Sequence, residues 1–217
     1  GVVALLAWKF KVVLLFVLTK GKILLLGLTK ASTVFSMLLS LGVYWAAWGW
    51  KFALGLVLSI YVHEMGHVAM LRRYGIKATA PMFIPGVGAF VLMKQHPATP
   101  TEDARVGLAG PLWGFGAAVF AYAVSMIMAW PSWAAIAKVG AWINLFNLMP
   151  IWQLDGGRAF HAISRIQRWI IVALIFGMWV TVQDGMLILL LLVAGFRAFG
   201  EAPKESDRVA FVEYGFL

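Results

Sequence analysis

The chain has 217 residues, of which 62% are hydrophobic and only 12% are charged, against about 25% charged residues in a typical soluble domain. Its mean hydropathy of +0.87 excludes a soluble domain, whose surface needs polar cover, and disorder, which needs low hydrophobicity. The net charge is +9, but no basic run is interleaved with aromatic residues, so we expect no nucleic-acid partner. The composition predicts an all-α protein of the lipid bilayer.

Apolar segments of helical length predict about six transmembrane helices. Before them, residues 1–30 carry five lysines among apolar residues, which favours an interfacial or amphipathic segment over a span. We expect residues 31–199 to form a polytopic membrane domain and residues 200–217 to form a polar cytoplasmic tail. The six expected spans are residues 31–48, 52–71, 104–129, 133–149, 169–182 and 185–199.

Three segments between these spans have a different character. Residues 76–94 are rich in Gly, Pro and β-forming residues, which predicts a short membrane-associated β-hairpin or a re-entrant segment. Residues 96–103 are polar and predict a loop. Residues 155–168 carry three arginines and predict a surface helix.

The positive charges predict the topology. If the first span starts inside, 14 of the 18 Lys and Arg residues fall on the inner side, and only Lys51 and Lys138 fall on the outer side. This asymmetry is what the positive-inside rule requires of a multi-pass membrane protein. We therefore expect both termini to be cytoplasmic.

The second predicted span contains His63-Glu64-Met65-Gly66-His67. Histidines at positions i and i+4 lie on one helical face, where both can reach one zinc ion, and the glutamate can act as general base toward water. The alternative is a set of polar side chains satisfied by neighbouring helices, but a charged residue inside a membrane helix is costly and points to function. His67 lies five residues before Arg72, roughly 8 Å along a helix, so we expect the site nearer the cytoplasm.

A catalytic zinc ion needs a third protein ligand and an open position. The chain has no cysteine, which excludes thiolate ligands. Among the remaining acidic residues, Asp155 follows an apolar helix on the same predicted side as His67. It is either this third ligand or the N-cap of the following helix.

HEMGH in a membrane helix, followed about 80 residues later by Asn-x-x-Pro-x-x-x-x-Asp-Gly at 147–156, resembles the site-2 protease family of intramembrane zinc metalloproteases. The resemblance covers roughly residues 50–170 and includes LAGPLWG at 108–114. It implies one zinc ion per chain, held by His63, His67 and Asp155, with Glu64 as the catalytic base.

The family resemblance also places Asn147 near the active site. Its amide could donate a hydrogen bond to the oxyanion or the substrate backbone, or it could make a helix–helix hydrogen bond, as expected for Asn144 one turn earlier. Residues 80–94 could offer a strand edge that holds an unwound substrate, or they could only close the cavity. If residues 80–94 form this strand edge, Gly86 and Gly88 would permit the turn of the hairpin or a close approach of the backbone to substrate.

These features predict an intramembrane zinc metalloendopeptidase that hydrolyses peptide bonds within or near transmembrane segments. The resemblance suggests single-pass regulators or signal-peptide remnants as substrates, in a prokaryotic cell membrane. We expect neither an inserted PDZ domain nor a nucleotide-sensing domain. Three alternatives are disfavoured. A membrane protease that takes its third ligand from a later glutamate would need a glutamate that no other predicted span supplies, and a degenerate metal-binding scaffold would have lost its base or a ligand, whereas Glu64 and all candidate ligands are present. A transporter would be expected to show an internal repeat, and the chain has none.

Overall fold

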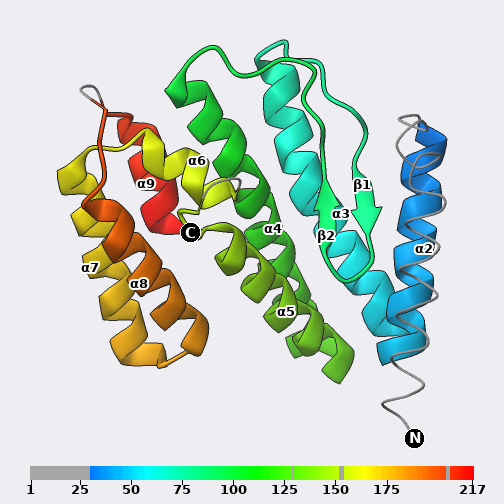
Figure 1. Cartoon of the computed structure of the whole chain (residues 1–217). Coiled ribbons are helices and arrows are strands. Elements are labelled where there is room, and N and C mark those ends of the chain that lie inside the picture. The colour runs from blue at the N-terminus through cyan, green and yellow to red at the C-terminus, as the bar shows by residue number, and fades with distance from the viewer. Residues whose placement is uncertain (1–29, 129, 152–153, 204–205) are drawn as a thin grey trace, which may run out of the picture.

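The computed structural model describes residues 30–128, 130–151, 154–203 and 206–217. The interfacial segment predicted for residues 1–30 lies outside these ranges, apart from Lys30, where the first described helix begins. Eight helices and two short strands make up the described part of the chain (Figure 1). The helices are α2 (Lys30–Trp48), α3 (Trp50–Arg73), α4 (Pro100–Met128), α5 (Pro131–Asn147), α6 (Asp155–His161), α7 (Arg165–Val182), α8 (Gly185–Ala198) and α9 (Arg208–Phe216).

Each of the six predicted spans corresponds for most of its length to one described helix, but these helices differ in length. Three of them, α3, α4 and α7, are long and apolar enough to cross a membrane. Helix α8 has only 14 residues, and the apolar stretch of α2 runs over 17 residues, Ser32–Trp48. Helix α5 also has 17 residues, including Lys138 and Asn144. The mainly helical fold with three candidate spans is therefore established, while six membrane crossings stay a prediction.

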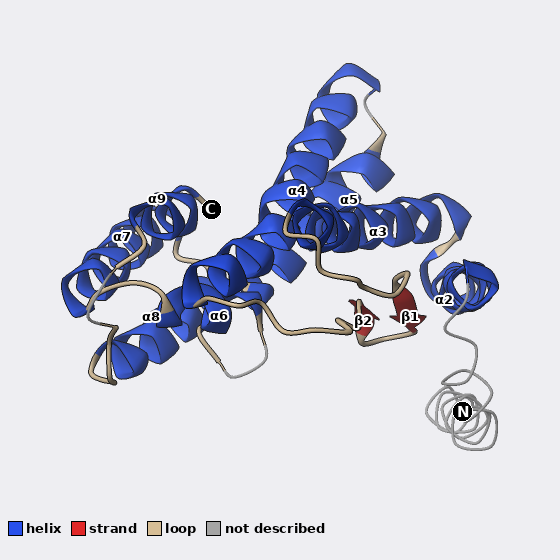
Figure 2. Cartoon of the chain, turned by 90° about the horizontal axis from the view of Figure 1, so that it is seen from above, coloured by secondary structure: helices blue, strands red, loops and turns tan. Residues whose placement is uncertain are grey.

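Helix α4 is the centre of the packing. It contacts α3, α5, α6 and α9, and it lies between α3 and α5 in Figure 1. Viewed from above, the two strands lie beside α3, between α2 and α6 (Figure 2). This arrangement brings segments that are far apart in the sequence to the same end of the bundle.

The predicted hairpin is present. Strand β1 (Met82–Ile84) pairs antiparallel with β2 (Gly88–Phe90), and Ala78 forms a further bridge to Met93. Helix α2 holds the β1 side of this hairpin: the Ser36 hydroxyl accepts a hydrogen bond from the Phe83 amide at 3.2 Å, and the Tyr44 hydroxyl accepts one from the Gly86 amide at 3.0 Å.

Two boundaries differ from those predicted. Helix α4 begins at Pro100, inside the expected loop, because the Thr99 hydroxyl caps it by accepting from the Glu102 amide. The surface helix expected over residues 155–168 ends at His161, because Ser164 starts a new helix through a capping box.

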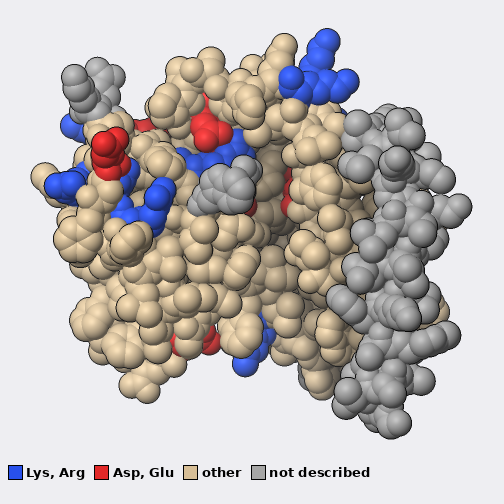
Figure 3. All heavy atoms as spheres, viewed as in Figure 1, with Lys and Arg blue, Asp and Glu red and all other residues tan. Residues whose placement is uncertain are grey.

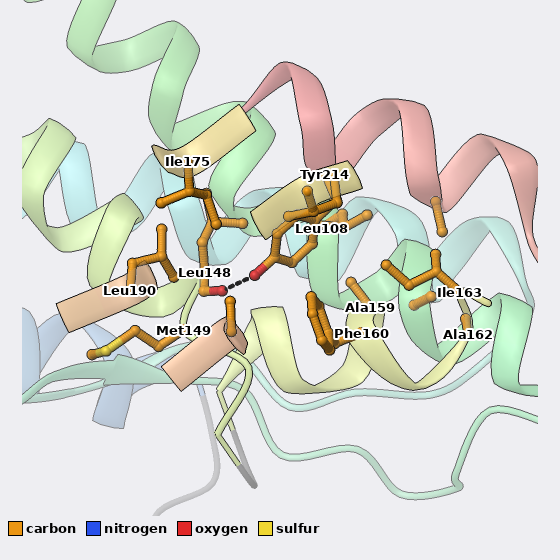
Figure 4. Packing of buried hydrophobic residues seen from close by; sticks show 14 of the residues in the cluster. Leu108, Leu148, Met149, Ala159, Phe160, Ala162, Ile163, Ile175, Leu190 and Tyr214 are labelled. Carbon is orange, nitrogen blue, oxygen red and sulfur yellow. Dashed lines mark hydrogen bonds between the residues drawn. The ribbon is translucent and has the colours of Figure 1, made fainter. Parts of the chain in front are cut away.

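The sequence did not predict α9, which lies in the segment expected to be a polar tail. Asp207 caps this helix by accepting hydrogen bonds from two amides of its first turn. Tyr214 is buried in a hydrophobic cluster with Leu148 and Phe160, and its hydroxyl donates a hydrogen bond to the Leu148 carbonyl (Figure 4). Helix α9 thereby supports the loop that connects α5 to Asp155.

Candidate active site

Helix α3 carries the three polar residues of the HEMGH motif into the interior. His63, Glu64 and His67 are 4%, 6% and 8% exposed. Leucine, valine and isoleucine residues precede and follow the motif in the sequence, so α3 as a whole is apolar enough to cross a membrane despite these three polar residues. The two imidazole rings stack edge to face with centroids 5.0 Å apart, as the i, i+4 spacing predicts.

Asp155 meets these histidines from α6. Its Oδ2 atom lies 3.2 Å from His63 Nε2 and 3.4 Å from His67 Nε2, and the two Nε2 atoms are 3.3 Å apart. Asp155 is the first residue of α6, and its side chain does not cap that helix. The N-cap alternative is therefore wrong, and the structure brings together the three ligand candidates expected from the sequence.

The other ring nitrogens determine what these three atoms can bind. His63 Nδ1 lies 2.8 Å from the side-chain oxygen of Asn144, and His67 Nδ1 lies 2.7 Å from the Val106 carbonyl oxygen. Both oxygens are acceptors, so both Nδ1 atoms donate and, in neutral imidazoles, both Nε2 atoms carry lone pairs. Three acceptors then converge with no proton between them, which is an arrangement that a cation stabilises.

The spacing fits zinc. Two ligand atoms of a tetrahedral zinc ion lie about 3.4 Å apart when each is about 2.1 Å from the metal. The three observed separations, 3.2 to 3.4 Å, match one face of such a tetrahedron. The fourth vertex is left for water or substrate, as in catalytic zinc sites.

Three glycines of α4 make this close approach possible. We call Gly107, Gly110 and Gly114 the glycine face of α4. A Cβ atom at Gly107 would lie 2.9 Å from the Asp155 carbonyl oxygen, and one at Gly110 would contact the Nε2 atoms of both histidines. A Cβ atom at Gly114 would contact the Asn144 amide. The glycine face therefore lies directly against the candidate metal site.

A cavity of about 530 Å³ adjoins the cluster, lined by Glu64, Asn147 and residues 89–93 among others. Figure 3 shows acidic atoms within a recess of the molecular face. Asn147 is half-buried, and no hydrogen bond joins its side-chain amide to the part of the chain that the structure describes. Its amide is thus free to bind a molecule in the cavity, and its role there stays a prediction.

The glycines predicted to contact substrate lie at the tip of the hairpin. Gly86 and Gly88 have φ angles of 80° and 130°, a region that favours glycine. They are not among the residues that line the cavity, whereas the following residues 89–93 are. The structure accounts for both glycines by the turn, and their contact with substrate stays a prediction.

Sequence reasoning missed two contacts that organise the site. Asn144 was expected to bond between helices, and it does, but its partner is a candidate metal ligand. Arg158, one turn after Asp155, donates through Nε and Nη2 to Asp103 Oδ1 at 2.8 and 2.6 Å. This ion pair fixes α6 to the first turn of α4.

Comparison with known proteins shows which family this chain is similar to. Residues 51–133 match peptidase family M50. The chain is 30% identical over 178 residues to zinc metalloprotease MJ0392 of Methanocaldococcus jannaschii, covering 73% of this chain and 50% of that protein. It is 32% identical over 112 residues to stage IV sporulation protein FB of Bacillus subtilis, covering 50% of this chain and 38% of that protein.

The chain thus spans half or less of the length of these relatives. The matched residues include the HEMGH motif and the glycine face of α4. The names of the relatives support a zinc metalloprotease, and the resemblance seen in the sequence is confirmed: the part of the chain that carries the HEMGH motif matches peptidase family M50, the family of the site-2 proteases.

Proposed function

We propose that this chain is an intramembrane zinc metalloprotease that hydrolyses peptide bonds in or near transmembrane segments of membrane proteins. The observation that carries the proposal is the convergence of His63 Nε2, His67 Nε2 and Asp155 Oδ2 within 3.4 Å of one another, beside a cavity that Glu64 lines. These three side chains would hold one zinc ion. When bound, zinc supplies Lewis acidity, which lowers the pKa of water and stabilises negative charge on the scissile carbonyl oxygen.

The chain's own residues supply the proton transfers. Glu64 accepts a proton from the attacking water and later delivers it to the leaving amine, as general base and then general acid. Asn147, which lines the same cavity, donates a hydrogen bond to the carbonyl oxygen or to the substrate backbone.

The hairpin supports binding of an extended substrate. Within the described chain, β2 pairs with β1 on one side only, and residues 89–93 line the cavity. The unpaired edge of β2 can therefore pair with a substrate segment that has unwound from its helix. Such pairing satisfies main-chain groups that lipid cannot hydrate.

The charge distribution supports the expected topology. Arg72 and Arg73 end α3, Arg165 begins α7 and Arg197 lies in the last turn of α8, and in Figure 3 basic atoms gather mostly in the upper part of the face shown. We propose that this end is cytoplasmic, that both termini lie there and that the site is nearer this side. The proposed setting is a multi-pass protein with six spans in a prokaryotic cell membrane, acting on single-pass regulators or signal-peptide remnants.

Cleavage of a single-span model substrate in vesicles tests the proposal. We expect the wild-type protein to yield fragments cut in or near the span, and Glu64→Gln to reduce turnover about 10²–10⁴-fold while keeping its zinc. The control is Glu201→Gln, an exposed position that should retain wild-type turnover. Cleavage by Glu64→Gln at the wild-type rate, or cleavage without bound metal, would refute the mechanism.

A further inference from the structure

We propose that Asn144 is the positioning residue that fixes the orientation and tautomer of His63 as a zinc ligand; this inference rests on the proposed function. Asn144 lies on α5 and is 6% exposed. Its side-chain oxygen is 2.8 Å from His63 Nδ1, and its side-chain nitrogen donates to the Gly140 carbonyl oxygen at 2.7 Å.

The Gly140 contact determines which way the amide faces. A carbonyl oxygen only accepts hydrogen bonds, so the nitrogen of the Asn144 amide has to face Gly140, and its oxygen has to face His63. That oxygen accepts the proton on His63 Nδ1, which leaves the lone pair on Nε2. This lone pair is directed at Asp155 Oδ2, 3.2 Å away, and hence toward the candidate metal position.

Gly114 holds the amide in place from a third helix. A Cβ atom at Gly114 would contact the oxygen of the Asn144 amide and would lie 2.7 Å from its carbon and its nitrogen. The backbone of α4 therefore packs against one face of the amide, while α3 and α5 bind its two ends. The orientation of His63 thus depends on contacts from three helices.

The two histidines are oriented by different kinds of group. His67 donates to the main-chain oxygen of Val106, which no substitution at that position removes. His63 depends on the side chain of Asn144, so this orientation can be changed by mutation. A group that orients a metal-bound histidine in this way typically contributes 10- to 100-fold to metal affinity.

Zinc affinity, measured by chelator competition on the purified full chain in detergent, tests the proposal. Asn144→Ala and Gly114→Ala should each weaken zinc binding 10- to 100-fold, the second because its methyl group displaces the amide. The absorption spectrum of the Co²⁺-substituted protein should also change in both variants, because the ligand field depends on the orientation of His63.

Two controls separate this effect from loss of packing. Ser59→Ala removes another buried polar group near Gly140 and leaves the Asn144 side chain that contacts His63 in place, and Gly116→Ala adds a methyl group to α4 where no atom lies within 4 Å. Both should bind zinc like the wild type. Far-UV circular dichroism and thermal unfolding establish whether each variant is folded.

The double variant Gly114→Ala/Asn144→Ala distinguishes the two roles. The added methyl group fills part of the space that the asparagine leaves, so a residue that only packs would give a double variant with restored zinc affinity. A positioning residue gives a double variant that stays 10- to 100-fold weaker. Restored affinity in the double variant, or wild-type affinity in Asn144→Ala, would overturn the proposal, whereas a wild-type protein that binds no zinc would refute the proposed function itself.

Discussion

Gly110→Ala is the most informative single substitution at the candidate site. Gly110 lies on the glycine face of α4, against the rings of His63 and His67. A Cβ atom there would contact His67 Nε2 and would lie 2.8 Å from His63 Nε2. The added methyl group would therefore occupy space that the two ligand atoms need in order to converge on a metal.

The size of the effect follows from these distances. A carbon atom 2.8 Å from a ring nitrogen is roughly 0.7 Å inside ordinary van der Waals contact, which begins near 3.5 Å. Zinc–ligand distances tolerate deviations of only about 0.2 Å. We expect at least one histidine to leave the site, and zinc affinity to fall by more than the roughly 100-fold typical of a lost outer contact.

Zinc titration against a competing chelator measures this loss, with Gly116→Ala as the matched control on the same helix. Position 116 has no atom within 4 Å of an added Cβ, so alanine there should keep zinc affinity and stabilise α4 by about 0.5–1 kcal/mol. Zinc affinity of Gly110→Ala within threefold of the wild type would refute the placement of α4 against the histidines.

Three further predictions concern the elements around the site. Gly156→Ala should weaken zinc binding in the same titration, because a Cβ atom there would contact the Leu148 carbonyl oxygen and displace the start of α6; unchanged affinity would contradict this. Ser164→Ala removes the N-cap of α7 and should cost about 1 kcal/mol in thermal unfolding, whereas no change would show that the cap contributes nothing. The pKa of His161 is lowered by burial and by repulsion from Arg197, so its contribution to stability is present above about pH 6.5 and is lost as the pH falls through the folded-state pKa. His161→Gln should therefore flatten the dependence of Tm on pH between 7 and 5. An unchanged slope of Tm against pH in this variant would contradict the role given to His161.

The ligand set could be predicted because its signals are local. The spacing of His63 and His67 places both on one helical face whatever packs against it. Asp155 was one of two alternatives from its position alone, and the resemblance of the 147–156 motif to the site-2 protease family selected it as the third ligand. The hairpin could also be predicted, since Pro85-Gly86-Val87-Gly88 is a strong turn signal. Each of these inferences needs only a short stretch of sequence.

The packing around the ligands could not be predicted in the same way. Glycine at 107, 110 and 114 is compatible with many helix contacts, and only the arrangement of α3, α5 and α6 around α4 shows what each glycine lies against. The role of Asn144 has the same origin, because its partner is 81 residues away on another helix. Helix α9 was missed although Asp207 is a good N-cap residue, since nine residues are too few to establish a periodic apolar face.

The central claim is that side chains from α3 and α6 hold one zinc ion. X-ray absorption at the zinc edge, combined with metal analysis of the purified chain, tests it most directly. We predict one zinc ion per wild-type chain, four-coordinate, with two imidazoles and oxygen ligands at about 2.0–2.2 Å, and loss of stoichiometric zinc in Asp155→Ala. Full zinc occupancy with an unchanged ligand shell in Asp155→Ala, or a wild-type chain without zinc, would contradict the account.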